Sequence, residues 1–304
     1  MTFAGNVAAF PVGDDASDII GRTIYPDGGR MILDYTVLWP KMAEGQRPMW
    51  TIDLNADLGE GYGPWTMGDD AAMLDIVSSA NVACGGHASD PETMFRTLTL
   101  AKQRGVVTGA HPSYPDKEGF GRRRLPFPPA EIERFTAAQI GALIGIGALV
   151  GQPISYVKPH GALGNVASED RPVAEAIVRA ARAVDSKLAI LAISGTMLET
   201  VARERGVAVY SEIFADRGYT PAGNLVPRSE PGAMIHDPAA ATTRLLKFFE
   251  NWKMPTVGGG AVTLEAHSVC IHGDSPDAIA MARHIREAFR VRGLSVAPFV
   301  PKAG

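Results

Sequence analysis

The stretch Trp50-Thr-Ile-Asp-Leu-Asn-Ala-Asp-Leu-Gly-Glu60 joins a strand pattern to a cluster of polar residues. Its apolar and β-branched residues predict a strand, and strand alternation places Asp53, Asn55 and Asp57 on one face. Polar side chains on a buried strand are costly unless they form hydrogen bonds or bind a metal. We therefore expect either a hydrogen-bonded network or a general base or metal ligand where this strand ends, with Glu60 close by.

A short apolar run followed by polar residues recurs along the chain. The runs at 78–83, 106–108, 154–157, 188–193, 207–214 and 268–271 lead into Cys84-Gly-Gly-His87, Gly109-Ala-His111, Lys158-Pro-His160, Ser194-Gly195, Ala215-Asp216-Arg217 and His272-Gly-Asp274. With residues 52–58 they make seven predicted strands, and all but one end in acids, bases or imidazoles.

Helical patterns fill the intervals between these strands. Asp90 is a predicted N-cap with Pro91 in the first turn, and Pro128-Pro-Ala-Glu131 opens a long helix that runs to Gly151. Apolar spacings of three and four predict helices over 169–184, 197–205, 237–252 and 275–292. Strands that alternate with helices indicate a parallel sheet in an α/β fold. The strand count favours a seven-stranded (β/α) barrel, open or distorted, and a doubly wound sheet is the alternative.

Both architectures gather the carboxyl ends of their strands at one edge, so the polar residues that follow the strands should meet there. A single histidine is more often structural than catalytic, but four follow four different strands: His87, His111, His160 and His272. Such imidazoles can move protons near neutral pH or bind a metal. His236, His267 and His284 lie in loop or helix patterns, and we expect no such role for them.

Cationic residues near these strand ends are candidates for binding a substrate anion. Lys158, Arg217 and Arg228 could hold a carboxylate or an oxyanion, and surface ion pairs are the alternative for Asp216, Arg217 and Arg228. At least two of Arg122, Arg123 and Arg124 are expected in a solvated loop.

Composition restricts the function classes. The 304 residues carry a formal net charge of −4, which argues against binding nucleic acid or an anionic membrane surface. No run reaches the ~18 apolar residues of a membrane span, and the glycine-rich run 140–150 suits a buried helix. Without a visible secretory signal, and with only Cys84 and Cys270 as expected reduced thiols, the expected compartment is the cytoplasm.

Two further features concern the ends of the pattern and the absence of familiar motifs. Residues 1–48 read as an N-terminal extension, either poorly ordered or an artefact of start assignment, before a single domain over 49–304.

The glycines at 258–260 lack the Lys-Ser/Thr of a P-loop, and no GxSxG or HExxH motif is present. This chain therefore has no recognisable ATP site of its own.

Eight sequence blocks resemble the LamB/YcsF family, the group of 5-oxoprolinase A subunits. In chain order they begin at Asp53, Ser79, Gly109, Gly119, Val157, Phe214, Leu225 and Cys270, and the resemblance covers about residues 50–298. Gly86 and Gly164 depart from the family pattern, which usually has an aromatic residue at the first position and Tyr at the second. Both departures would remove bulk near the expected pocket and so bear on substrate size.

The resemblance implies a distorted seven-stranded (β/α) barrel of the glycoside hydrolase/deacetylase type. It also implies cleavage of 5-oxo-L-proline to L-glutamate with ATP hydrolysis, in a complex with 5-oxoprolinase subunits B and C, through which ATP would bind. The stand-alone alternatives are a metal-dependent deacetylase or other amidohydrolase, and a non-catalytic carbohydrate or organic-acid binding subunit.

The family resemblance and the strand-end positions together assign expected roles. The expected catalytic residues are Asp57, Glu60, His87, His111, Lys158 and His160, and the expected substrate-binding residues are Asn55, Asn81, Asp216, Arg217, Arg228, His272 and Asp274. Analogy with the related deacetylases implies a divalent metal on Asp57, His87 and His111. Asp57 or Glu60 would serve as the base for a water molecule that attacks the ring carbon.

Overall fold

The computed structural model describes residues 50–272 and 277–300. The first described strand begins at Trp50, beside the expected domain start at residue 49. The expected extension over residues 1–48 and the expected binding residue Asp274 lie outside the described residues, and both remain predictions.

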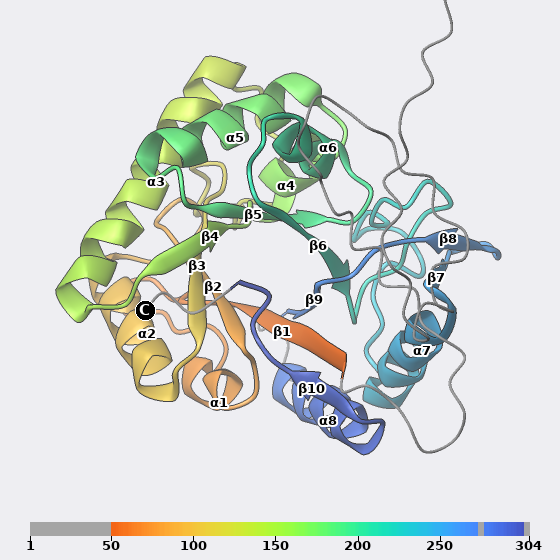
Figure 1. Cartoon of the computed structure of the whole chain (residues 1–304). Coiled ribbons are helices and arrows are strands. Elements are labelled where there is room, and N and C mark those ends of the chain that lie inside the picture. The colour runs from red at the N-terminus through yellow and green to blue at the C-terminus, as the bar shows by residue number, and fades with distance from the viewer. Residues whose placement is uncertain (1–49, 273–276, 301–304) are drawn as a thin grey trace, which may run out of the picture. The chain divides into compact units, whose positions relative to one another are not determined.

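Seven parallel strands form a closed ring in the order β1-β2-β3-β4-β5-β6-β9, because β9 pairs both with β6 and with β1 (Figure 1). The ring confirms the predicted seven-stranded (β/α) barrel and excludes the alternative of a doubly wound sheet. The strands are β1 (Trp50–Leu58), β2 (Ser79–Ala83), β3 (Val107–His111), β4 (Ile154–Val157), β5 (Ala189–Ile193), β6 (Val209–Phe214) and β9 (Ser268–Ile271).

The ring is distorted at β1, which has different neighbours along its length. Its first residues, Trp50 to Ile52, pair with β10 (Leu294–Val296), and the next four, from Asp53, pair with β9. The short strand β10 was not expected from the sequence. It extends the sheet beside β1 without entering the ring.

Helices pack outside the ring (Figure 1). They are α1 (Asp70–Leu74), α2 (Pro91–Arg104), α3 (Pro129–Val150), α4 (Gly161–Ala167), α5 (Arg171–Val184), α6 (Met197–Glu204), α7 (Pro238–Asn251) and α8 (Ala278–Val291). The six predicted helices are present, and the Asp90 side chain caps α2 by accepting the Thr93 N–H. The short helices α1 and α4 and the hairpin of β7 (Lys253–Pro255) and β8 (Ala261–Thr263) were not predicted.

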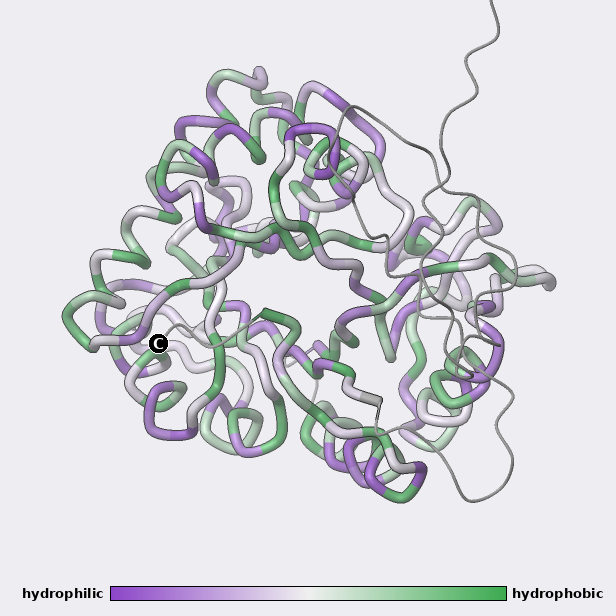
Figure 2. The backbone as a smooth tube through the Cα atoms, in the orientation of Figure 1, coloured by the Kyte–Doolittle hydropathy of each residue, from purple (hydrophilic) through white to green (hydrophobic). Residues whose placement is uncertain are grey.

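The apolar run 140–150 lies in α3, but only one face of this helix is buried. Ile140 and Leu143 are buried, whereas Leu149 is 75% exposed, so the expectation of a buried helix holds for one face and is wrong for the other. Among the described residues, α3 is the one helix long and apolar enough to pass a membrane-span test by length and composition. The backbone in Figure 2 alternates between hydrophobic and hydrophilic along the outer helices, as expected of elements with one face toward the ring.

The two faces of the ring strands bury different kinds of side chain, apolar on the outer face and polar on the inner face. The even residues of β1, Ile52 to Leu58, belong to the large apolar core between strands and helices. The odd residues Asp53, Asn55 and Asp57 lie in the ring, where Asn55 reaches Glu212 of β6 at 2.9 Å. Below them a small apolar cluster that includes Tyr156 and Val300 fills the barrel, with Phe299 packed against it. The polar interior is thus bounded by apolar side chains at the amino-terminal end of the strands.

Candidate active site

A cavity of about 390 Å³ lies at the carboxyl ends of the ring strands. Its lining brings together residues of β1, β3, β5 and β6 and residues that follow β3, β4, β6 and β9. The lining includes Asp57, His111, Arg122, Lys158, His160, Gly164, Glu212, Phe214, Arg217, Arg228 and His272. The predicted meeting of distant strand ends is therefore present in the fold.

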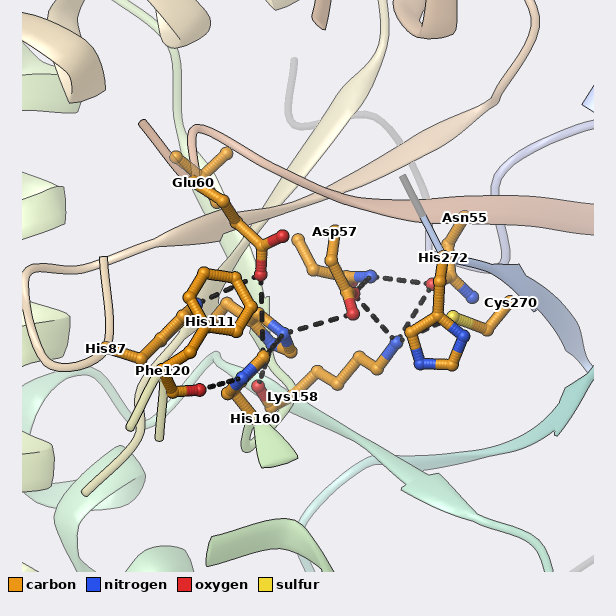
Figure 3. Close-up of polar contacts among 12 residues, drawn as sticks. Asn55, Asp57, Glu60, His87, His111, Phe120, Lys158, His160, Cys270 and His272 are labelled. Atoms are coloured by element: carbon orange, nitrogen blue, oxygen red, sulfur yellow. Dashed lines mark hydrogen bonds and ion pairs between the residues drawn. The ribbon is translucent and has the colours of Figure 1, made fainter. Parts of the chain in front are cut away.

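Lys158 occupies the floor of this cavity and joins two carboxyl groups. Its Nζ lies 3.0 Å from Asp57 Oδ1 and donates to Asn55 Oδ1 at 3.2 Å (Figure 3). The same atom lies 2.9 Å from Glu212 Oε1. Burial alone would lower the pKa of Lys158, but Asp57, Cys270 and Glu212 outweigh it and hold the pKa well above its usual value. Lys158 is therefore a fixed positive charge in the cavity floor.

Asp57 is held between this ammonium group and an imidazole. Oδ1 also accepts a hydrogen bond from Asn81 at 2.8 Å, and Oδ2 lies 3.4 Å from His111 Nε2. Burial would raise the pKa of Asp57, but His111 and Lys158 together hold it well below its usual value. Asp57 is thus ionised at neutral pH.

Three imidazoles and one carboxylate form a second, buried cluster beside Asp57. Glu60, His87, His111 and His160 place one donor atom each within 4.8 Å of the others. His87 Nε2 is 3.1 Å from Glu60 Oε1, His160 Nδ1 is 3.0 Å from His111 Nε2, and the His87 and His160 rings stack at 3.7 Å (Figure 3). We call these four residues the histidine cluster.

Backbone carbonyls fix the tautomers in the histidine cluster. His111 Nδ1 lies 2.6 Å from the Lys158 carbonyl and His160 Nε2 lies 3.0 Å from the Phe120 carbonyl, so each of these nitrogens donates its N–H. The remaining lone pairs, on His111 Nε2 and His160 Nδ1, then face each other. Burial and the neighbouring histidines lower the pKa of both His87 and His160 well below its usual value, which favours neutral imidazole. Converging imidazole nitrogens, with His111 and His160 each oriented by a backbone carbonyl, are the donor arrangement of a metal site.

The donor set differs from the predicted one. His87 and His111 were expected as metal ligands and belong to the histidine cluster, together with Glu60 and His160, which were expected as catalytic residues. Asp57, the third expected ligand, contacts Lys158 and Asn81 and lies 3.4 Å from His111 without belonging to the cluster, and its role as a ligand stays a prediction. Spacing along the strands could not distinguish the two arrangements because both place a carboxylate near the same imidazoles.

Asn55 and Asn81 lie beneath the cavity, and both are fully buried. Asn55 Nδ2 donates to Glu212 and Ser268, and Asn81 Nδ2 donates to Asn55 and Asp57. Their amide groups position the charged residues of the floor. Neither is among the residues that line the cavity, so direct substrate contact by them stays a prediction.

The expected anion-binding residues lie on the side of the cavity near β6. Arg217 is buried and donates to the carbonyls of Ala233 and Val226, and burial together with Arg228 lowers its pKa to about 10. Arg228 is exposed at the mouth. His272 Nδ1 pairs with Asp216 at 2.7 Å, so this imidazole is oriented by a carboxylate.

The loop after β3 covers the histidine cluster. Arg122, Arg123 and Arg124 are all exposed, as expected for a solvated loop, but Arg122 also lines the cavity. Of the departures from the family pattern, Gly164 lines the cavity, whereas Gly86 does not. A side chain at Gly86 would meet Gln139, whose side-chain amide is hydrogen-bonded to the N–H and the carbonyl of Ser113. The extra space expected at Gly86 is therefore filled.

Glu212 was missed by the sequence reasoning. It lies within β6 and not after it, so the rule that selected strand-end residues passed over it. A signal was available, because strand alternation places Glu212 on the same face as Phe214 and the run that contains it is otherwise mostly apolar.

Comparisons with protein families, with related sequences and with solved structures all point to the same family. The model of the LamB/YcsF family matches residues 52–303. The 5-oxoprolinase A subunit of Gluconobacter oxydans is 50% identical over 81% of this chain and 97% of its own length, and that of Azorhizobium caulinodans is 49% identical over 83% and 100%. The crystal structure of a lactam utilization protein from Thermus thermophilus superposes with a TM-score of 0.77 at 42% identity, covering 81% of this chain and 99% of that one.

Proposed function

The chain belongs to the LamB/YcsF family, and we propose that it is the ring-opening hydrolase component of a 5-oxoprolinase, which converts 5-oxo-L-proline to L-glutamate. The observation that carries the proposal is the cavity floor, where Lys158 bridges Asp57 and Glu212 beside His111. A small cyclic amide needs a base for water, a cation for the developing oxyanion and a proton for the leaving nitrogen. The floor offers groups of all three kinds within a cavity suited to a small molecule.

Asp57 is the general base in this proposal. Its carboxylate is ionised and is held by Asn81 and Lys158, so it can accept a proton from a water molecule placed above it. Lys158, 3.0 Å from Asp57, stabilises the negative charge that develops on the lactam oxygen. Arg217, with Arg228 at the mouth, holds the substrate carboxylate.

The histidine cluster fits a divalent metal, because its donor atoms converge and burial lowers the pKa of His87 and His160, which favours their neutral forms. We propose that Glu60, His87, His111 and His160 hold it. Nitrogen-rich sets with one carboxylate suit zinc and other first-row metals better than magnesium. A bound metal would supply Lewis-acid polarisation at this side of the cavity.

Partner subunits complete the proposed reaction. The relatives are named as A subunits, a name that belongs to a multi-subunit enzyme. Amide resonance makes a lactam a poor electrophile, and we propose that subunits B and C use ATP to activate it, since this chain carries no familiar nucleotide motif. We propose a cytoplasmic location for the assembled enzyme.

The test is glutamate release from 5-oxoproline by the purified chain, with and without the partner subunits and ATP. Glutamate should form only in the complete mixture, and Asp57→Asn should abolish it while circular dichroism stays unchanged. Asp185→Asn, at a helix end outside the cavity, is the matched control and should keep wild-type turnover. Hydrolysis of acetylated sugars without ATP would instead favour a stand-alone deacetylase, and near-normal rates in Asp57→Asn would remove Asp57 from the mechanism.

A further inference from the structure

The two oxygens of the Glu212 carboxyl group have different surroundings. Glu212 is 1% exposed and lines the cavity. Oε1 accepts two hydrogen bonds, from Lys158 Nζ at 2.9 Å and from Asn55 Nδ2 at 2.9 Å. Oε2 is buried and has no hydrogen-bond partner among residues 50–272 and 277–300. A buried carboxylate oxygen without a donor carries the full cost of lost hydration.

This asymmetry matches a carboxylic acid better than a carboxylate. In the acid form Oε1 is the carbonyl oxygen, which accepts both donors, and Oε2 is a hydroxyl donor whose acceptor the bound substrate would supply. Ionisation would instead place part of the negative charge on an oxygen that no donor solvates. The hydrogen bonds therefore indicate that Oε2 carries the proton.

The charges that face Glu212 from the surrounding strands lead to the same conclusion. Lys158 is the cation in contact with it, and that cation also pairs with Asp57, while Asp53, Tyr156, Cys270 and Tyr219 supply no further positive charge. Burial raises the pKa of Glu212, and Lys158 offsets this only in part. The pKa of Asp57, on the other side of the same ammonium group, is held well below its usual value. Environments that separate two neighbouring carboxyl groups in this way mark one as an acid and the other as a base.

We propose that Glu212 is the proton donor of the site, whose Oε2 proton passes to the ring nitrogen as the carbon–nitrogen bond of the lactam breaks. This inference rests on the proposed ring-opening function and names the group that the leaving nitrogen requires. Lys158 and Asn55 act as positioning residues, because they hold Oε1 and leave Oε2 without a partner among the described residues.

The proton and electron balance is complete without an additional reactant. The water oxygen bonds to the ring carbonyl carbon, and one water proton passes to Asp57. The carbon–nitrogen bond then breaks, its electron pair stays on nitrogen, and nitrogen takes the proton from Glu212 to become the amine of the open product. Asp57 ends protonated and Glu212 ionised, and the second water proton stays on the new carboxyl group. Transfer of one proton from Asp57 to Glu212 then restores both groups, so the net change is the addition of one water.

The distances allow both groups to act on one amide. Asp57 Oδ1 lies 3.0 Å and Glu212 Oε1 lies 2.9 Å from Lys158 Nζ, so the two carboxyl groups flank one ammonium group. The reacting carbon and nitrogen are ~1.3 Å apart. A small ring bound over Lys158 can therefore present its carbon to a water on the Asp57 side and its nitrogen to Glu212.

The test compares Glu212→Gln with wild type in the assembled enzyme, with ATP and the partner subunits. Gln keeps the shape and the Oε1 interactions but cannot donate a carboxylic proton. We expect kcat to fall about 10²- to 10⁴-fold with KM little changed. The wild-type kcat should decline as pH rises through the pKa of Glu212, and the variant should lose that limb. Glu199→Gln, a buried glutamate on α6 outside the cavity, should keep the wild-type kcat per folded molecule.

An infrared measurement tests the acid form without turnover. Wild-type protein at neutral pH should show the carbonyl stretch of a protonated carboxyl group that Glu212→Gln lacks. Should Glu212→Gln fail to fold, Glu212→Asp keeps the acid but withdraws it by one methylene group, so kcat should fall while the decline at high pH remains. A wild-type kcat in Glu212→Gln, or no protonated carboxyl band assignable to Glu212, overturns the inference. If the wild-type enzyme releases no glutamate, the proposed function itself is wrong. The infrared band needs no turnover, so the two failures can be told apart.

Discussion

Replacing Lys158 by Met should destabilise the barrel strongly and in a pH-dependent way. The substitution keeps most of the side-chain volume but removes the ammonium group that lies 3.0 Å from Asp57 and 2.9 Å from Glu212. At an effective dielectric constant of ~20, the ion pair with the ionised Asp57 has a gross Coulomb energy of about 5–6 kcal/mol at this distance. The cost of burying the charges offsets much of this gain, and removing one partner of a buried pair typically costs about 3–5 kcal/mol. We expect a loss of this size near pH 7.

The pH dependence follows from the carboxyl groups left behind. In the wild type, the low pKa of folded Asp57 contributes stability above the unfolded pKa, and this contribution is lost as pH falls. Without Lys158 the folded pKa of Asp57 should rise above the unfolded value. The variant is then stabilised at low pH, where the group is protonated in both states, and loses stability as pH rises through the folded pKa. The difference between wild type and variant should therefore shrink steadily on acidification.

Urea unfolding followed by circular dichroism from pH 5 to 8 measures this difference directly. Lys187→Met, an exposed lysine on the same barrel, is the control and should change the free energy of unfolding by less than about 0.5 kcal/mol. A Lys158→Met effect under about 1 kcal/mol, or one that does not vary with pH, would show that the ammonium group does not hold the two carboxyl groups together.

Three further predictions concern the interior and the histidine cluster. Burial raises the pKa of Asp53 to about 6, so Asp53 binds a proton more tightly when folded. Relative to Asp53→Asn, wild-type stability should therefore fall by about 2 kcal/mol as pH rises from 4 to 7, and parallel unfolding curves would contradict this. His160→Ala should lower the zinc content of purified protein at least tenfold by elemental analysis, with unchanged circular dichroism; equal zinc in both proteins would exclude His160 as a ligand. Gly121→Ala should reduce both zinc content and turnover, because its Cβ would lie 2.8 Å from His87 Cβ at a backbone φ of +62°, whereas Gly141→Ala on open helix surface should change neither.

Much of the fold was predictable because its signals are local. Each ring strand is a short apolar run, and Asp90, Asp170 and Asp237 cap helices with their own side chains. The elements that were missed have weak local signals. The strand β10 is three residues long and exists because β1 offers it an unpaired edge, and the glycines at 258–260 gave no sign that they turn a hairpin.

The site was predictable in outline and not in its pairings. The rule that parallel strands gather their carboxyl ends brought Asp57, His87, His111, Lys158 and His272 to one rim, as the fold confirms. Which carboxylate faces which imidazole depends on side-chain direction and on loop carbonyls such as those of Phe120 and Lys158, which no spacing rule encodes. Their substrate roles stay predictions. Glu212 was missed because it lies inside its strand, before the last residue Phe214, and the reasoning looked only at residues that follow the strands.

The double pairing of β1 has a consequence for the order of folding. Asp53 and Ser268, which share a hydrogen bond across the β1–β9 seam, are 215 positions apart in the chain. During synthesis, one edge of β1 therefore stays unpaired until β9 and then β10 have left the ribosome. Contacts of such long sequence separation slow folding, and an open edge invites pairing with other chains. Aggregation of nascent chains should accordingly be most sensitive to substitutions at this seam.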